Sequence, residues 1–126
     1  MLENEYAKFW IENGVLFFEY KTGVVLDLEA AKLIVSDRLR VQDGKAYPVF
    51  CDARGIKDWN KAARDYLAKE GSYLITKVGL LVDTPLSLMT LNFYLTINKP
   101  LVPTQIFTDK IAALQYLMSE LDQNKG

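Results

Sequence analysis

The chain has 126 residues, a length that fits one domain (residues 1–126) with a core large enough to need no disulfide. Fifteen basic residues stand against sixteen acidic ones, so we expect no nucleic-acid binding. One cysteine excludes an internal disulfide, and the lack of histidine excludes His-based triads and the common zinc sites. No apolar run is long enough to cross a membrane, and the acidic start is unlike a signal peptide. We therefore expect a cytoplasmic protein.

The first expected element is a β-hairpin. Strand-like runs occupy residues 7–12 and 15–20, and Asn13-Gly14 between them suits a tight turn because both residues accept a positive φ. After Val24-Val25-Leu26, helices and strands alternate along the rest of the chain. The expected elements are a helix over 28–43, a strand over 47–51, a helix around 59–67, a strand over 74–82, a helix from 85, a strand over 102–107 and a final helix from 109. The order ββαβαβαβα predicts an α/β fold, with a mixed five-stranded sheet and four helices.

Aspartates occupy the transitions from strand to helix. They are Asp27, Asp52, Asp83 and Asp109. An acidic ligand pocket at the carboxyl edge of the sheet is one interpretation. Helix capping is the favoured one for all but Asp52, with Thr84 and Thr108 as the caps of the last two helices. Asp52 has Arg54 nearby as a possible ion-pair partner, and we expect neither a metal nor a cofactor.

Basic residues are in excess between residues 38 and 64, with seven against three acidic ones. In the second expected helix, Lys57, Lys61 and Arg64 recur at i, i+4 and i+7, opposite the apolar stripe. A solvated helix face is the simpler interpretation. The alternative is a docking face for an acidic partner or a phosphate-bearing ligand.

The third expected helix is apolar on two sides. One stripe consists of Leu86, Met89, Phe93 and Ile97, which we assign to the core. The opposite stripe consists of Leu88, Leu91 and Leu95, which we assign to self-association in a homodimer. The alternative is that Lys99-Pro100 and the chain termini fold over that second stripe.

Cys51 lies in an apolar strand and is expected to be a buried structural thiol, because no histidine is available to activate it. Tyrosine, lysine and carboxylate side chains form no arrangement that points to a reaction. We therefore expect no enzymatic activity.

Two segments resemble the STAS/SpoIIAA-like family, which includes the anti-sigma-factor antagonists. The segment 52–56, Asp-Ala-Arg-Gly-Ile, is similar to the family's Asp-x-Ser-Gly-Val. The segment 102–117 resembles the "iFxxxxeAlxWL" ending of uncharacterised bacterial SpoIIAA-like proteins. Together with the order of elements, the resemblance spans most of the chain and implies the SpoIIAA-like fold.

The resemblance also implies a function. In partner-switching members, the serine of the first motif starts a helix and is phosphorylated by a kinase. Arg54 stands at that position here and has no hydroxyl, so this switch does not carry over. The resemblance still implies a non-enzymatic regulatory module that recognises another protein. The expected contact surface is Asp52, Arg54, Gly55, Lys57, Lys61 and Arg64.

Two other functions remain open. One is a carrier of a small apolar molecule or lipid, similar to SEC14-type relatives of this fold, with a pocket beneath the third helix. The other is an enzyme that uses Asp52 together with a lysine or tyrosine, which the absence of a catalytic motif disfavours.

Overall fold

The structure is a computed structural model that describes residues 1–125, with side chains to Met118. Its elements are β1 (Leu2–Glu3), β2 (Ala7–Glu12), β3 (Val15–Tyr20), β4 (Val24–Leu26), α1 (Leu28–Gln42), β5 (Tyr47–Asp52), β6 (Ile56–Trp59), α2 (Lys61–Lys69), the 3-10 turn η1 (Glu70–Ser72), β7 (Ile75–Leu81), α3 (Pro85–Ile97), β8 (Thr104–Phe107) and α4 (Lys110–Lys125).

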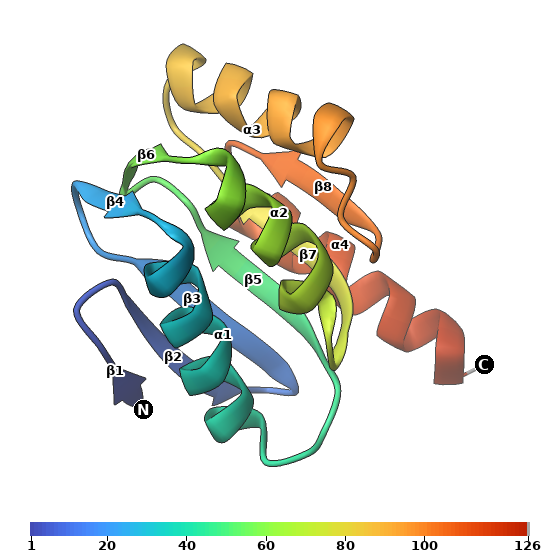
Figure 1. Cartoon of the computed structure of the whole chain (residues 1–126). Helices are drawn as coiled ribbons and strands as arrows, with labels where there is room; N and C mark the ends of the chain where they lie inside the picture. The colour runs from blue at the N-terminus through green and yellow to red at the C-terminus, as the bar shows by residue number, and fades with distance from the viewer. Residues whose placement is uncertain (126) are drawn as a thin grey trace.

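The main sheet has the strand order β1-β2-β3-β5-β7-β8, antiparallel from β1 to β3 and parallel from β3 to β8. Helices α1, α2 and α3 cover one face and α4 covers the other (Figure 1). The predicted α/β fold and its five strands are confirmed. The structure adds the two-residue β1 and a small separate sheet of β4 and β6.

The predicted hairpin turn is confirmed by its backbone angles. Asn13 and Gly14 have φ values of 53° and 77°, which place both residues in the left-handed region. The turn fixes a register in which Trp10 lies opposite Phe17, and the two rings stack with centroids 5.3 Å apart.

Alternation along the strands divides the core into two layers. Leu16 and Phe18 of β3 face α1–α3, whereas Val15 and Phe17 face α4. Cys51 faces α1–α3 and is buried, and desolvation raises the pKa of its thiol well above the ordinary value. The expectation of a buried structural thiol is therefore confirmed.

The helix starts confirm some predicted caps and correct others. The Asp27 side chain accepts a hydrogen bond from the backbone N–H of Ala30 at 2.8 Å, and Thr84 caps α3 with Pro85 at the first helical position. The prediction that Thr108 is the N-cap of α4 is wrong. The cap is Asp109, which accepts from the N–H of Ala112 at 2.9 Å.

Helix α2 begins later than predicted. Asn60 caps it by accepting from the N–H of Ala63 at 2.9 Å, and Trp59 belongs to β6 instead. Lys57 also lies in β6, so it does not share a helix face with Lys61. The basic stripe that the sequence predicted for one helix is therefore divided: Lys57 belongs to strand β6, whereas Lys61 and Arg64 belong to helix α2.

The two faces of α3 are the reverse of the prediction. The buried side chains are Leu91 and Tyr94, and the ring centroid of Tyr94 lies 4.8 Å from that of Trp59. Leu95 is half-buried, and only Leu88 of the predicted seam is exposed. The large exposed side chains are instead Leu86, Met89, Phe93 and Ile97. A seam built on Leu91 is therefore wrong, because that side of α3 packs into the core.

Gly55 is required by a close backbone approach. A Cβ atom at this position would lie 2.6 Å from the carbonyl oxygen of Tyr20 and would also collide with that of Lys21. The carbonyl oxygen of Gly55 accepts from the N–H groups of Gly23 and Val24, at 2.8 and 3.2 Å. These contacts join the end of β5 to the end of β3 and the start of β4.

Replacing Gly55 with alanine is expected to lower the free energy of unfolding by roughly 2–4 kcal/mol, because rigid backbone atoms occupy the space of the methyl group. Urea denaturation of Gly55→Ala measures the loss. Gly71→Ala is the control, since its Cβ would make ordinary contacts at 3.7 Å with the side chain of Leu67. Equal stability losses in the two variants would contradict the close approach.

Candidate functional site

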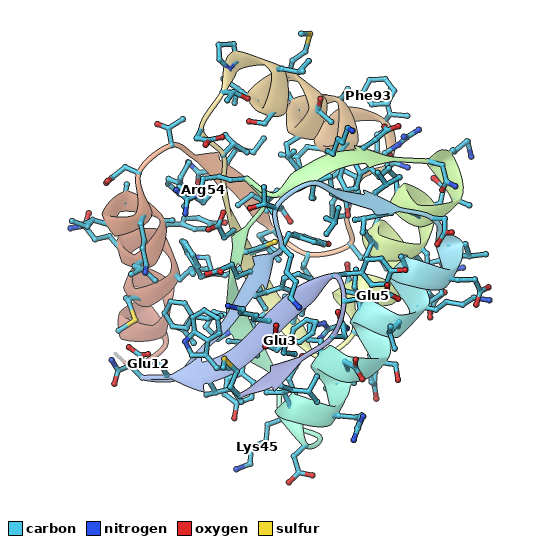
Figure 2. All side chains as sticks on the ribbon, turned by 90° about the vertical axis from the view of Figure 1, so that its left-hand side faces the viewer. Glu3, Glu5, Glu12, Lys45, Arg54 and Phe93 are labelled. Atoms are coloured by element: carbon cyan, nitrogen blue, oxygen red, sulfur yellow. The ribbon has the colours of Figure 1, made fainter. Side chains whose placement is uncertain are left out.

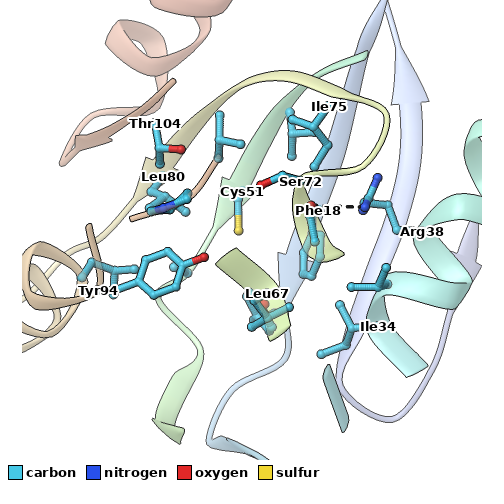
Figure 3. A pocket seen from close by; sticks show the side chains of 18 of the residues that line it. Phe18, Ile34, Arg38, Cys51, Leu67, Ser72, Ile75, Leu80, Tyr94 and Thr104 are labelled. Carbon is cyan, nitrogen blue, oxygen red and sulfur yellow. Dashed lines mark hydrogen bonds between the residues drawn. The ribbon is translucent and has the colours of Figure 1, made fainter. Parts of the chain in front are cut away.

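A cavity of about 90 Å³ lies between the sheet and helices α1–α3 (Figure 3). Side chains of the sheet line one side, and α1, α2 and α3 contribute the others. Most of the lining is apolar, and its main members are Phe18, Val49, Leu80, Ile34, Leu67 and Leu91. The sequence prediction of an apolar pocket beneath the third helix therefore has a counterpart in the structure.

A few polar groups also line this cavity. Tyr20 and Tyr94 contribute hydroxyls, and Figure 3 shows the Tyr94 hydroxyl pointing toward the sulfur of Cys51. Desolvation raises the pKa of both tyrosines and of the Cys51 thiol. All three groups therefore stay neutral at physiological pH, as hydrogen-bonding groups within an apolar wall.

Arg38 is the charged residue at the edge of the cavity, and sequence reasoning counted it only as part of the basic excess. It is 2% exposed and donates to the Gln42 side chain, to the Tyr73 carbonyl at 3.0 Å and to the Gly71 carbonyl at 3.2 Å. Desolvation lowers its pKa to about 10, so the guanidinium remains protonated at neutral pH. Its four-residue spacing from the buried Ile34 was the signal that it faces inward.

The predicted pairing of Asp52 with Arg54 is confirmed. The Arg54 side chain donates to both carboxylate oxygens, from Nε at 2.9 Å and from a terminal nitrogen at 2.7 Å, and the Arg54 backbone N–H donates at 3.1 Å. These hydrogen bonds and the charge of Asp52 raise the pKa of Arg54. The carboxylate is nearly buried, while half of the arginine side chain is exposed.

Two other members of the predicted contact surface, Lys61 and Arg64, lie apart from this pair and from the adjacent Gly55. Asp52 follows Phe50 by two residues in β5, so it faces α4, whereas Lys61 and Arg64 lie on α2 across the sheet. In Figure 2, Arg54 lies on the side of α4, and Phe93 of α3 lies on the other side. The structure therefore does not bring the predicted set together as one patch.

The two basic residues of α2 have local partners. Lys61 forms an ion pair with Asp65 at 2.7 Å. Arg64 donates to the Trp59 carbonyl at 3.0 Å, and its guanidinium lies 5.7 Å from the ring centroid of Phe93. Arg64 thus connects the start of α2 to the outer side of α3.

In the part of the chain that the structure describes, no three His, Cys, Asp or Glu side chains are grouped so that they could hold a metal ion. Asp27 and Asp109 instead cap helices. None of the described helices combines the length and the apolar character that crossing a membrane requires.

Comparisons with known proteins give a family and a fold. A family model described as a domain of unknown function, DUF7793, matches residues 9–120. A crystal structure of an uncharacterised DUF3478-family protein from Shewanella loihica, described as having a SpoIIAA-like fold, is similar with a TM-score of 0.61. The two are 14% identical, and the match covers 93% of this chain and 98% of that one. Among curated proteins, none is similar enough to count as a match.

Removing Arg54 is expected to leave the Asp52 carboxylate nearly buried without its cation. We expect Arg54→Met to lower the free energy of unfolding by about 1–2 kcal/mol, a value reduced by the exposure of Arg54. Lys61→Met is the matched control, because its pair with Asp65 is exposed, and it should change stability little.

A double variant, Asp52→Asn with Arg54→Met, should recover most of this loss because no buried charge remains. Chemical denaturation of all four proteins gives the comparison. If Arg54→Met lowers the free energy of unfolding no more than Lys61→Met does, the claim that the Asp52–Arg54 ion pair stabilises the fold is contradicted.

Proposed function

This chain belongs to the DUF7793 family, and we propose that it is a non-enzymatic domain that binds a small, largely apolar molecule. The observation that carries the proposal is the apolar cavity beneath α3. Ligand sites in proteins are typically concave and apolar, with a few polar groups that orient the ligand. The cavity has this composition, and residues from five strands and from helices α1, α2 and α3 contribute to it.

The polar groups of the cavity support a particular ligand chemistry. Tyr20, Tyr94 and Cys51 are neutral, so they suit a hydroxyl or carbonyl group better than a charged one. The charged Arg38 already donates to backbone carbonyls of the protein. The rest of the cavity wall consists mainly of hydrocarbon side chains, including those of Leu67 and Leu91. The expected ligand is therefore a small molecule with an apolar body and one neutral polar group.

A role in binding, without catalysis, fits the state of the reactive groups. The Cys51 thiol has a raised pKa, which disfavours a thiolate nucleophile. Both oxygens of Asp52 accept hydrogen bonds from Arg54, so this carboxylate is held as an ion-pair partner and is poorly placed to abstract a proton.

A protein-recognition module is the second candidate. Arg54 supports it, because this residue stands at the phosphoacceptor position of the resembling family and is held by Asp52 with half of its side chain exposed. An acidic group of a partner would share the guanidinium with Asp52. Since Arg54 has no hydroxyl, such a contact would be constitutive or controlled from the partner's side. Lys57, Lys61 and Arg64 would form a separate contact.

Binding can be tested with 1-hexanol, which has an apolar chain and one hydroxyl. We expect its addition to shift the amide NMR signals of Leu67, Leu91 and Tyr94 in the wild type. Leu67→Trp should abolish these shifts, because the indole fills the cavity. Leu33→Trp on α1 is the control, since this exposed residue is not among those that line the cavity, and it should leave binding unchanged.

Binding of equal strength in Leu67→Trp, or shifts confined to exposed residues, would contradict the proposal. Should that variant fail to fold, xenon under pressure provides a second test on the wild type, because xenon enters dry apolar cavities. We expect it to shift the methyl signals of Val49 and Leu80. Unchanged methyl signals would likewise count against an accessible cavity.

A further inference from the structure

In the part of the chain that the structure describes, the outer face of α3 is a largely exposed apolar surface. Leu86, Met89, Phe93 and Ile97 are 50–70% exposed, and Leu101 just beyond the helix is 71% exposed. Figure 2 shows Phe93 at this outer side. Single exposed apolar side chains are ordinary, but a contiguous group of this kind marks an interaction surface. We call these five residues the α3 outer face.

The charged residues that flank α3 along the sequence have a symmetric arrangement. From residue 84 to 98 the chain has no charged residue, while Asp83 stands before this segment and Lys99 directly after it. Both lie eight positions from Leu91. Met89 and Phe93 each lie two positions from it, and Leu86 and Ile97 lie five and six positions away.

This arrangement fits pairing with a second, antiparallel α3. A two-fold axis at the level of Leu91 would place Met89 of one copy opposite Phe93 of the other, and Leu86 opposite Ile97. It would also bring Asp83 of each copy toward Lys99 of the other. The two helix dipoles would run in opposite directions, which is favourable for neighbouring helices.

We propose that the α3 outer face is the seam of a homodimer in which two α3 helices pack antiparallel across a two-fold axis. The five side chains would bury about 500–600 Å² per copy, near the lower end for specific interfaces, so association in the micromolar range is expected. A lipid surface fits less well, because interfacial helices usually have Lys or Arg on their polar side and α3 has no charged residue.

Sedimentation equilibrium of the wild type over a concentration series from about 1 to about 300 μM tests the seam, since this range spans a micromolar dissociation constant. We expect the average mass to rise with concentration toward twice 14.4 kDa. Phe93→Glu should give a monomer, and it should stay folded because Arg64 lies beside the new carboxylate. Ile111→Glu replaces an apolar residue on α4 that is more exposed than Phe93, and this variant should remain a dimer. A monomeric wild type, or a dimeric Phe93→Glu, would overturn the proposal.

The antiparallel orientation has its own test at low salt, where surface charges are least screened. Asp83→Lys and Lys99→Asp each place like charges opposite one another, and each should weaken dimerisation several-fold. The double exchange should restore the wild-type affinity to within about twofold, since it recreates the opposite-charge contacts. A double exchange as weak as the single variants would contradict the antiparallel seam.

A vesicle experiment separates the seam from a membrane contact. We expect the wild type to stay in solution when vesicles of phosphatidylcholine are sedimented. A monomeric wild type that sediments with these vesicles, and loses this property in Phe93→Glu, would replace the dimer by a lipid-facing surface. Either result leaves the hexanol test of the cavity unaffected, because Phe93 is not among the cavity-lining residues.

Discussion

Helix α3 has large apolar side chains on two sides but can pack only one of them against the sheet. Leu91 and Tyr94 supply the inner side, where Tyr94 contacts Trp59 at the end of β6. Met89 and Phe93 remain outside. Both functional proposals depend on this constraint, because the inner side of α3 helps to enclose the cavity and the outer side is a largely exposed apolar surface.

The cavity combines a mostly apolar wall with a few buried polar side chains, among them Arg38, Tyr20 and Tyr94. Arg38 reaches inward from α1 and binds the carbonyls of Gly71 and Tyr73, which connects this helix to the segment before β7. Tyr20 stays neutral near Arg38, and Tyr94 stays neutral elsewhere in the cavity wall. The buried Arg38 charge is satisfied by neutral oxygens and fixes the position of α1, while both tyrosines line the cavity.

Sequence patterns predicted the sheet well, because alternation and the Asn13-Gly14 turn are local signals. They did not predict which side of α3 faces inward, since both stripes are apolar and only tertiary packing decides between them. The predicted contact surface around Arg54 is not one surface in the structure, and two local features of the backbone explain why. Strand alternation turns Asp52 toward α4, and the Asn60 cap moves the start of α2 beyond Lys57. Neither effect is visible in the spacing of charges alone.

Native mass spectrometry of the freshly purified wild type would test the central claim most directly, because it reports assembly and bound molecules together. The two roles assigned to α3 predict a particle of two chains that carries an additional small mass in at least part of the population. A bare single chain of 14.4 kDa, under conditions that preserve other micromolar complexes, would contradict both roles.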